Sequence, residues 1–124
     1  MWLGGLAAAA ALAAAGASAA EPPRVVTTFP AAGAKIPPSL AELTVAYDRP
    51  MAAAWSFTTG GEKAFPSVEG PPTLSDNRRT ITLPVRLTPN SSYVVWLNSG
   101  RYNNFRDEQG QPAQPYRLAF TATD

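Results

Sequence analysis

The side chains most suited to binding chemistry in this chain lie in residues 99–115 or just before that segment. They are Trp96, Arg101, Tyr102, Phe105 and Arg106. Aromatic rings and arginine are enriched at the energetic centres of protein–protein interfaces. Aromatic rings also form stacking faces for sugars. These residues therefore predict a binding surface, with an envelope or surface protein as the leading partner and a polysaccharide or cell-wall polymer as the alternative.

The length of this segment supports the same prediction. Residues 99–115 form a longer connection than the two to five residues that join most hairpins, and long loops on rigid scaffolds commonly carry binding. A second interpretation stays open, in which Tyr102 and Phe105 fold back to cap the end of the domain and the loop covers Trp96.

Catalysis by the usual nucleophilic routes is not expected. The chain has no His and no Cys, so a Ser or Thr nucleophile would lack its common base. The two lysines, Lys35 and Lys63, lie outside any recognisable Ser-Lys motif. The acidic residues mostly lie beside predicted turns, where turn chemistry accounts for Asp. We predict that the protein is not an enzyme and has no catalytic residues.

A metal centre or cofactor is not expected either. Asn103, Asn104, Asp107 and Glu108 offer oxygen ligands of the kind that calcium prefers. Their spacing matches no calcium loop, the neighbouring arginines would repel a cation, and a turn opened by Asp107 explains the cluster. Copper favours imidazole and sulfur ligands, and the chain offers only two methionines.

The first twenty residues predict export. Residues 1–20 contain no Lys, Arg, Asp or Glu and end in the small residues ASAA, as in the apolar core and cleavage site of a signal peptide. A membrane anchor would need roughly 20 strongly apolar residues, and alanine is only weakly hydrophobic. We predict a signal peptide at 1–20 and one domain at 21–124, periplasmic or secreted, with no transmembrane anchor after cleavage. The net charge of +1 argues against a nucleic-acid partner.

The sequence after residue 20, which we call the mature chain, predicts an all-β domain. The whole sequence has 13 prolines and 9 glycines, and all the prolines and six of the glycines lie after residue 20, where they interrupt every helical repeat. Short β-branched or aromatic runs recur between them. Strands are predicted at residues 25–29, 43–47, 55–58, 80–85, 93–98 and 116–121, with a weaker one at 65–68. Period-two alternation points Leu43, Val45 and Tyr47 inward. One-sided burial of this kind favours an antiparallel sandwich.

Two structural assignments follow from local patterns. Trp55 and Phe57 lie two residues apart, so they share one face of a strand, and we assign them to the core. Residues 87–93, LTPNSSY, place Tyr93 four residues after Pro89 at the head of a strand. Ig-like sandwiches build a tyrosine corner in this way. Leu87, Pro89 and Tyr93 are therefore predicted structural residues, after which Val94 and Trp96 face outward.

Two blocks of sequence resemble bacterial Ig-like domains of the S-layer type. Residues 29–38, FPAAGAKIPP, continue through LTVAYDRPM at 43–51. This block is similar to the family's opening, a Pro-Ala-x-Gly-Ala turn before a strand that ends in an aromatic, a polar pair, proline and methionine. Residues 87–93, with RDEQGQP at 106–112 and the Phe-Thr pair at 120–121, resemble its closing strands. The match spans residues 25–123.

This resemblance implies a seven-strand sandwich with a non-enzymatic role in surface, envelope or secreted proteins. The chain departs from the family's usual arrays by presenting one module directly after the predicted signal, which favours association with another molecule over a pure spacer role. The opening turn is also similar to that of periplasmic copper-resistance carriers. Those proteins bind copper through histidines, which this chain lacks.

Overall fold

Apolar side chains at every second position drive the strands of this chain to bury one face each. Leu43, Val45 and Tyr47 are each 2% exposed, whereas Thr44 and Ala46 between them are only partly buried. Because neighbouring side chains on a strand point to opposite sides, such strands must cover their apolar face with another layer, which in this protein is a second sheet. Burial of one large apolar side chain contributes roughly 1.5–3 kcal/mol.

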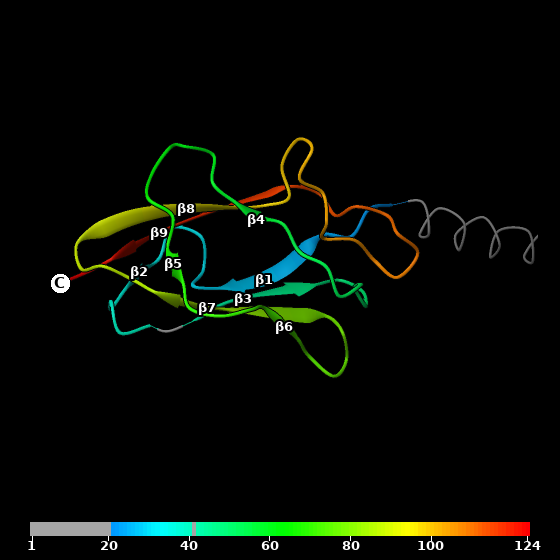
Figure 1. Ribbon diagram of the computed structural model, residues 1–124, viewed down its shortest axis with the longest axis horizontal. Coiled ribbons are helices and arrows are strands. Elements are labelled where there is room, and N and C mark those ends of the chain that lie inside the picture. The colour runs from blue at the N-terminus through cyan, green and yellow to red at the C-terminus, as the bar shows by residue number, and fades with distance from the viewer. Residues whose placement is uncertain (1–20, 41) are drawn as a thin grey trace, which may run out of the picture.

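The computed structural model describes residues 21–40 and 42–124, which form a two-layer β-sandwich (Figure 1). One sheet contains β1 (Val25–Phe29), β3 (Glu42–Tyr47) and β7 (Thr80–Arg86), with β5 (Ser67–Val68) and β6 (Thr73–Leu74) both paired to β7. The other sheet has the order β2 (Lys35–Ile36), β9 (Tyr116–Ala122), β8 (Ser91–Leu97) and β4 (Phe57–Thr58).

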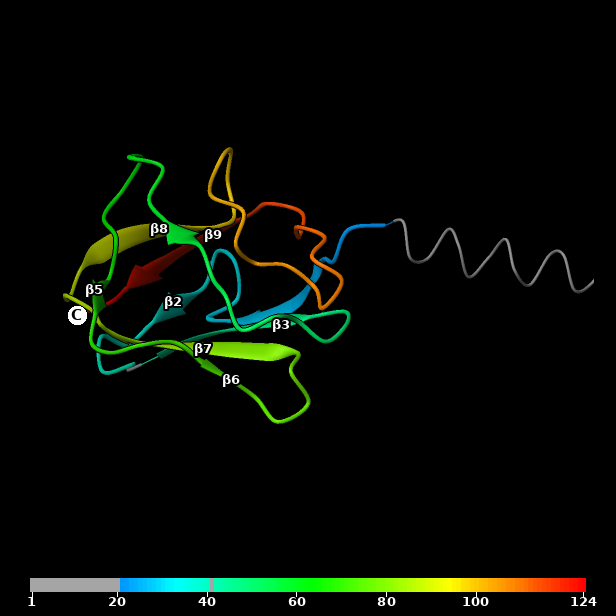
Figure 2. The ribbon, with the colours of Figure 1, turned by 45° about the vertical axis from the view of Figure 1, so that its right-hand side comes forward.

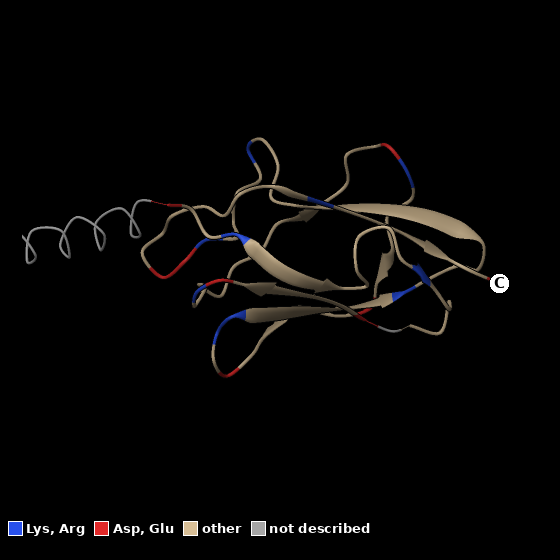
Figure 3. Cartoon of the chain, turned by 180° about the vertical axis from the view of Figure 1, so that it is seen from behind, with Lys and Arg blue, Asp and Glu red and all other residues tan. Residues whose placement is uncertain are grey.

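Strand register aligns the core residues across each sheet. In the first sheet Leu43 lies opposite Leu83, and in the second Val95 lies opposite Leu118 and Tyr93 opposite Phe120. The inner faces meet in one continuous core between the two layers (Figure 2). Trp55 and Phe57 pack against this core but are only partly buried. Charged residues gather mainly at the loops, whereas the strands are mostly uncharged (Figure 3).

The predicted all-β Ig-like sandwich is confirmed, with two differences. Each of the seven predicted strands overlaps a strand of the structure, but the described residues hold nine. The two that were not predicted, β2 and β6, are two-residue strands too short to show alternation. The pairing is also not wholly antiparallel, since β2 runs parallel to β9. The predicted signal peptide at 1–20 lies outside the described residues. Within those residues, no helix is long and apolar enough to cross a membrane.

Tyr93 forms a tyrosine corner at the start of β8. Its phenol oxygen accepts a 2.7 Å hydrogen bond from the backbone N–H of Thr88, and its ring stacks on Phe120 at 5.4 Å. Leu87 is buried beside it, whereas Pro89 is exposed in the turn. The bond ties the connection after β7 to β8, and therefore one sheet to the other.

Tyr47 offers a direct contrast with Tyr93. It is 2% exposed and its ring lies against Phe105 at 5.5 Å. Its hydroxyl, however, makes no hydrogen bond with any described residue. Burial without a partner raises the pKa of the Tyr47 phenol. A buried polar group without a partner costs stability.

We expect the same chemical change to have opposite effects at these two tyrosines. Tyr93→Phe removes a hydrogen bond and should lower the free energy of unfolding by about 1 kcal/mol, whereas Tyr47→Phe should leave it unchanged or raise it by up to about 1 kcal/mol. Urea denaturation of both variants measures the difference. An equal loss in both would contradict the assigned roles.

Candidate binding site

A buried amide holds the start of the 99–115 segment against the end of β8. Asn98 is fully buried and has a positive φ of 65°, a conformation that Asn tolerates better than most residues. Its Nδ2 donates to the carbonyl oxygens of Phe105 at 3.0 Å and Ala113 at 3.1 Å, and its Oδ1 accepts from the Phe105 N–H at 3.0 Å. The Asn98 side chain therefore holds two separate parts of the 99–115 segment, one at Phe105 and one at Ala113.

The segment beyond Asn98 projects as a tight hairpin tip, residues 99–102. The backbones of Ser99 and Tyr102 exchange hydrogen bonds of 2.9 and 2.8 Å, and Gly100 adopts a φ of 51°. Tyr102 is 52% exposed, and the Arg101 guanidinium lies 5.8 Å from the centre of its ring. A large aromatic surface is thus held in solvent by a short, bonded turn.

Phe105 does not contribute to this surface, and its predicted place in a binding site is wrong. Its side chain is fully buried and packs edge-on against Phe57 at 4.9 Å. The hydrogen bonds to Asn98 hold its backbone inward. For Phe105, the interpretation in which the loop caps the end of the sandwich is therefore the correct one.

Arg106 lies exposed at the other side of the same segment. Its Nε donates to the Asn103 carbonyl oxygen at 2.8 Å, so it supports the turn of the chain behind the tip. The neighbouring Asp107 is 3% exposed. Its Oδ1 accepts the backbone N–H groups of Gln109 at 3.0 Å and Gln111 at 2.9 Å.

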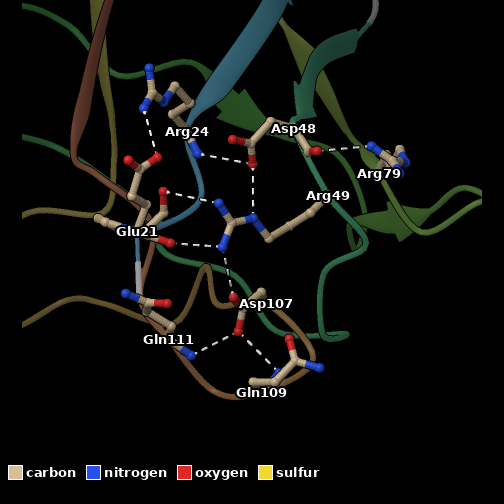
Figure 4. Close-up of polar contacts among 9 residues, drawn as sticks. Glu21, Arg24, Asp48, Arg49, Arg79, Asp107, Gln109 and Gln111 are labelled. Carbon is tan, nitrogen blue, oxygen red and sulfur yellow. Dashed lines mark hydrogen bonds and ion pairs between the residues drawn. The ribbon is translucent and has the colours of Figure 1, made fainter. Parts of the chain in front are cut away.

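The second carboxylate oxygen of Asp107, Oδ2, accepts a hydrogen bond from Arg49 Nη1 (Figure 4). The two side chains lie 3.3 Å apart, and Arg49 also bonds Asp48 and the Glu21 carbonyl oxygen. Asp107 therefore opens a turn, as predicted, and its carboxylate is taken up by the fold. Among the described residues there is no cluster of three His, Cys, Asp or Glu side chains that could hold a metal ion.

Residues 59–65, which we call the cover loop, lie over the outer face of β8. Val94 faces outward, as predicted, because its neighbours Tyr93 and Val95 point into the core. Its side chain is nevertheless only 2% exposed. The Val94 N–H donates to the Ala64 carbonyl oxygen at 3.2 Å, which brings the cover loop onto this face. Gly60 lies so close to the Trp96 indole that an added Cβ would be 2.7 Å from Nε1.

Trp96 is consequently half-buried under the cover loop. Its Nε1 donates to Glu62 at 3.2 Å, and Arg117 donates to the same carboxylate through Nε at 3.0 Å and Nη2 at 2.7 Å. Hydrogen bonds from Arg117 first, and from Trp96 second, lower the pKa of Glu62. Glu62 therefore acts as a charged tether that ties the cover loop to β8 and β9.

An apolar groove lies between the cover loop and the tip, which rise side by side from the outer side of the four-stranded sheet (Figures 1 and 2). This aromatic groove has a volume of about 360 Å³ and is lined by Phe57, Thr58, Thr59, Phe65 and Tyr102. Of the sequence-predicted binding residues, only Tyr102 lines it. Trp96, Arg101 and Arg106 lie outside the lining.

The sequence pattern did not identify Phe65 as a binding residue, and it assigned Phe57 to the core. A usable signal was present, because Gly60 and Gly61 mark a turn between two aromatic residues. What that pattern could not show is that this turn would stand beside the tip, some forty positions later in the chain.

The two packed sheets and the tyrosine corner define an Ig-like β-sandwich. A family model described as bacterial Ig-like domain matches residues 19–122, so the chain belongs to that family. No curated protein matches. Among the solved structures that share this fold are three structures of fragments of the S-layer protein SbsC.

These structures are only distantly related in sequence. A long SbsC fragment is 20% identical with a TM-score of 0.62, and the fragment of domains 1–6 is 20% identical with a TM-score of 0.63. The N-terminal part is 21% identical with a TM-score of 0.59. Each likeness covers 95% of this chain but only 16%, 16% and 27% of those chains, so it demonstrates a shared fold.

We expect Asn98→Ala to lower the free energy of unfolding by at least about 2 kcal/mol, because it leaves buried backbone groups of Phe105 and Ala113 without partners. Asn103→Ala is the matched control. Asn103 donates to the Gly100 carbonyl oxygen near the surface, so its loss should cost less than about 1 kcal/mol. Urea denaturation compares them, and equal costs would count against Asn98 as the anchor.

The tether should also depend on pH. The pKa of Glu62 in the folded state lies below its ordinary value of 4.5, so the tether is complete above that value and is lost as pH falls through the folded pKa. In NMR spectra, the indole N–H signal of Trp96 should shift as pH is lowered beneath about 4.5. Glu62→Gln should remove that shift. If the Trp96 signal titrates unchanged in Glu62→Gln, the tether is not its cause.

Proposed function

We propose that this chain is an exported, non-catalytic Ig-like module that binds a protein partner through the aromatic groove and the tip. Export is supported by the uncharged, alanine-rich residues 1–20. A surface or envelope role is supported by membership of the bacterial Ig-like domain family and by the fold shared with S-layer protein domains.

The observation that carries the proposal is the exposed Tyr102 at the rim of the aromatic groove. An aromatic ring that is 52% exposed beside an apolar hollow is the arrangement from which interface hot spots are built. Phe57 and Phe65 supply the wall opposite, and both are braced from beneath by the core. The groove is therefore held in shape before a partner arrives, which lowers the entropic cost of binding.

The lining of the groove supports binding over catalysis. It includes no carboxylate, amine or guanidinium, and its only titratable side chain is the Tyr102 phenol. General acid–base chemistry needs a positioned group with a pKa near the working pH. The groove offers no histidine, carboxylate or amine for this role.

The position of Arg101 favours a protein over a sugar. Its guanidinium lies over the Tyr102 ring at 5.8 Å, so one face of the ring is already covered by a cation. Sugar stacking uses an open aromatic face, whereas a paired arginine and tyrosine suit a protein interface, where both residue types are enriched.

A photo-crosslinking residue introduced in place of Thr59, at the rim of the groove, tests the proposal in the exporting cell. We expect one protein adduct, reduced about tenfold or more by Tyr102→Ala, as the loss of an interface hot spot would cause. Because Tyr102 is half-exposed, its replacement should change thermal stability little.

The same crosslinker at Thr88 is the matched control, since Thr88 is also exposed but lies outside the lining of the groove. Adducts of equal yield from Thr59 and Thr88 would overturn the proposal. Retention on insoluble cell-wall polysaccharide that Tyr102→Ala abolishes, with no protein adduct, would instead assign the groove to a carbohydrate.

A further inference from the structure

A second hollow lies on the outer face of the same sheet, on β8 and β9. Ser92 lies opposite Thr121, and Val94 opposite Ala119, in the antiparallel register of these strands. Because the alternate residues Tyr93 and Phe120 are in the core, these side chains share the outer face. We call the hollow of about 210 Å³ above them the basic pocket.

Small residues create the space of this pocket. Ala119 and Gly33 both line it, and neither has a side chain larger than a methyl group. The backbone N–H of Gly33 donates to the Ala119 carbonyl oxygen at 2.6 Å, so the turn before β2 is bound to the pocket wall. The hydroxyls of Ser92 and Thr121 lie 3.5 Å apart at one end.

Two cations line the pocket. Arg117 lies on β9, next but one to Ala119, and Lys63 comes from the cover loop. Arg117 uses Nε and Nη2 for Glu62, and its Nη1 donates to no described residue. Lys63 makes no hydrogen bond or ion pair with the described residues, although its charge helps to lower the pKa of Glu62. Glu62 itself is not part of the lining.

The charge balance indicates a singly charged ligand. Glu62 forms an ion pair with Arg117, whereas Lys63 has no ion-pair partner among the described residues and lines the same pocket as the hydroxyls of Ser92 and Thr121. A carboxylate matches this set, because it accepts hydrogen bonds from hydroxyl and ammonium donors. The apolar floor of Val94 and Ala119 suits a short aliphatic stem.

We propose that the basic pocket binds the carboxylate of an acidic residue in a protein partner, either a side chain or a chain end. A volume of about 210 Å³ is smaller than the roughly 300–1,000 Å³ of pockets for drug-sized ligands, so it accommodates one side chain. The inference rests on the proposed protein-binding function and adds that the partner presents an acidic residue next to the segment held by the aromatic groove.

The test is an NMR titration of the isotope-labelled protein with the acetylated N-methylamide of glutamate, and with that of glutamine as the uncharged match. We expect saturable shifts of the Gly33, Ala119 and Thr121 amide signals with the glutamate probe and not with the glutamine probe. Equal responses to both probes, or no saturable response to glutamate, would overturn the inference.

Three variants locate the binding within the pocket. Lys63→Gln should weaken affinity about two- to fivefold, the effect of one exposed ion pair, whereas Lys63→Arg should retain it. Ala119→Leu fills the floor from the outer face and should abolish saturation while the remaining spectrum stays folded. Full binding by Ala119→Leu would place the carboxylate elsewhere.

The experiments distinguish a failure of the carboxylate-binding inference from a failure of the proposed protein-binding function. If the Thr59 crosslink persists and depends on Tyr102 while the glutamate probe does not bind, the aromatic groove stands and the basic pocket is excluded as a carboxylate site.

Discussion

The buried amide of Asn98 is the contact on which the conformation of the 99–115 segment depends. It satisfies three backbone groups at once, from Phe105 and Ala113, in a place that excludes water. Unpaired groups there would each cost free energy, so the returning chain is held in one path. The tip then projects with a bonded turn and an exposed tyrosine, because the chain behind it is fixed by these hydrogen bonds.

A second polar contact divides the long 99–115 segment into two parts with different roles. Residues near the tip face solvent, whereas Asp107 is buried and shared between two backbone N–H groups and Arg49. This network ties the segment to the chain that follows β3 (Figure 4). In the sequence, Asp107 could be considered as a cation ligand. In the structure, its carboxylate instead accepts hydrogen bonds that stabilise the fold.

The cover loop organises the outer face of the four-stranded sheet. It packs over Val94, is tied to Trp96 through Glu62, and helps to line two hollows of different chemistry. The loop contributes Thr59 and Phe65 to the aromatic groove and Lys63 to the basic pocket.

The sequence by itself determined the sandwich, the inward faces of its long strands and the turn opened by Asp107, because period-two alternation and turn chemistry are local properties. It also indicated the long connection at residues 99–115, which contains Arg101 and Tyr102. Only the tertiary structure decided that Phe105 is core, that Trp96 is tethered and that Phe65 lines the groove. Those outcomes depend on residues far apart in the chain, such as Asn98 with Ala113 and Glu62 with Arg117, and no local pattern encodes which distant segment will cover a given face.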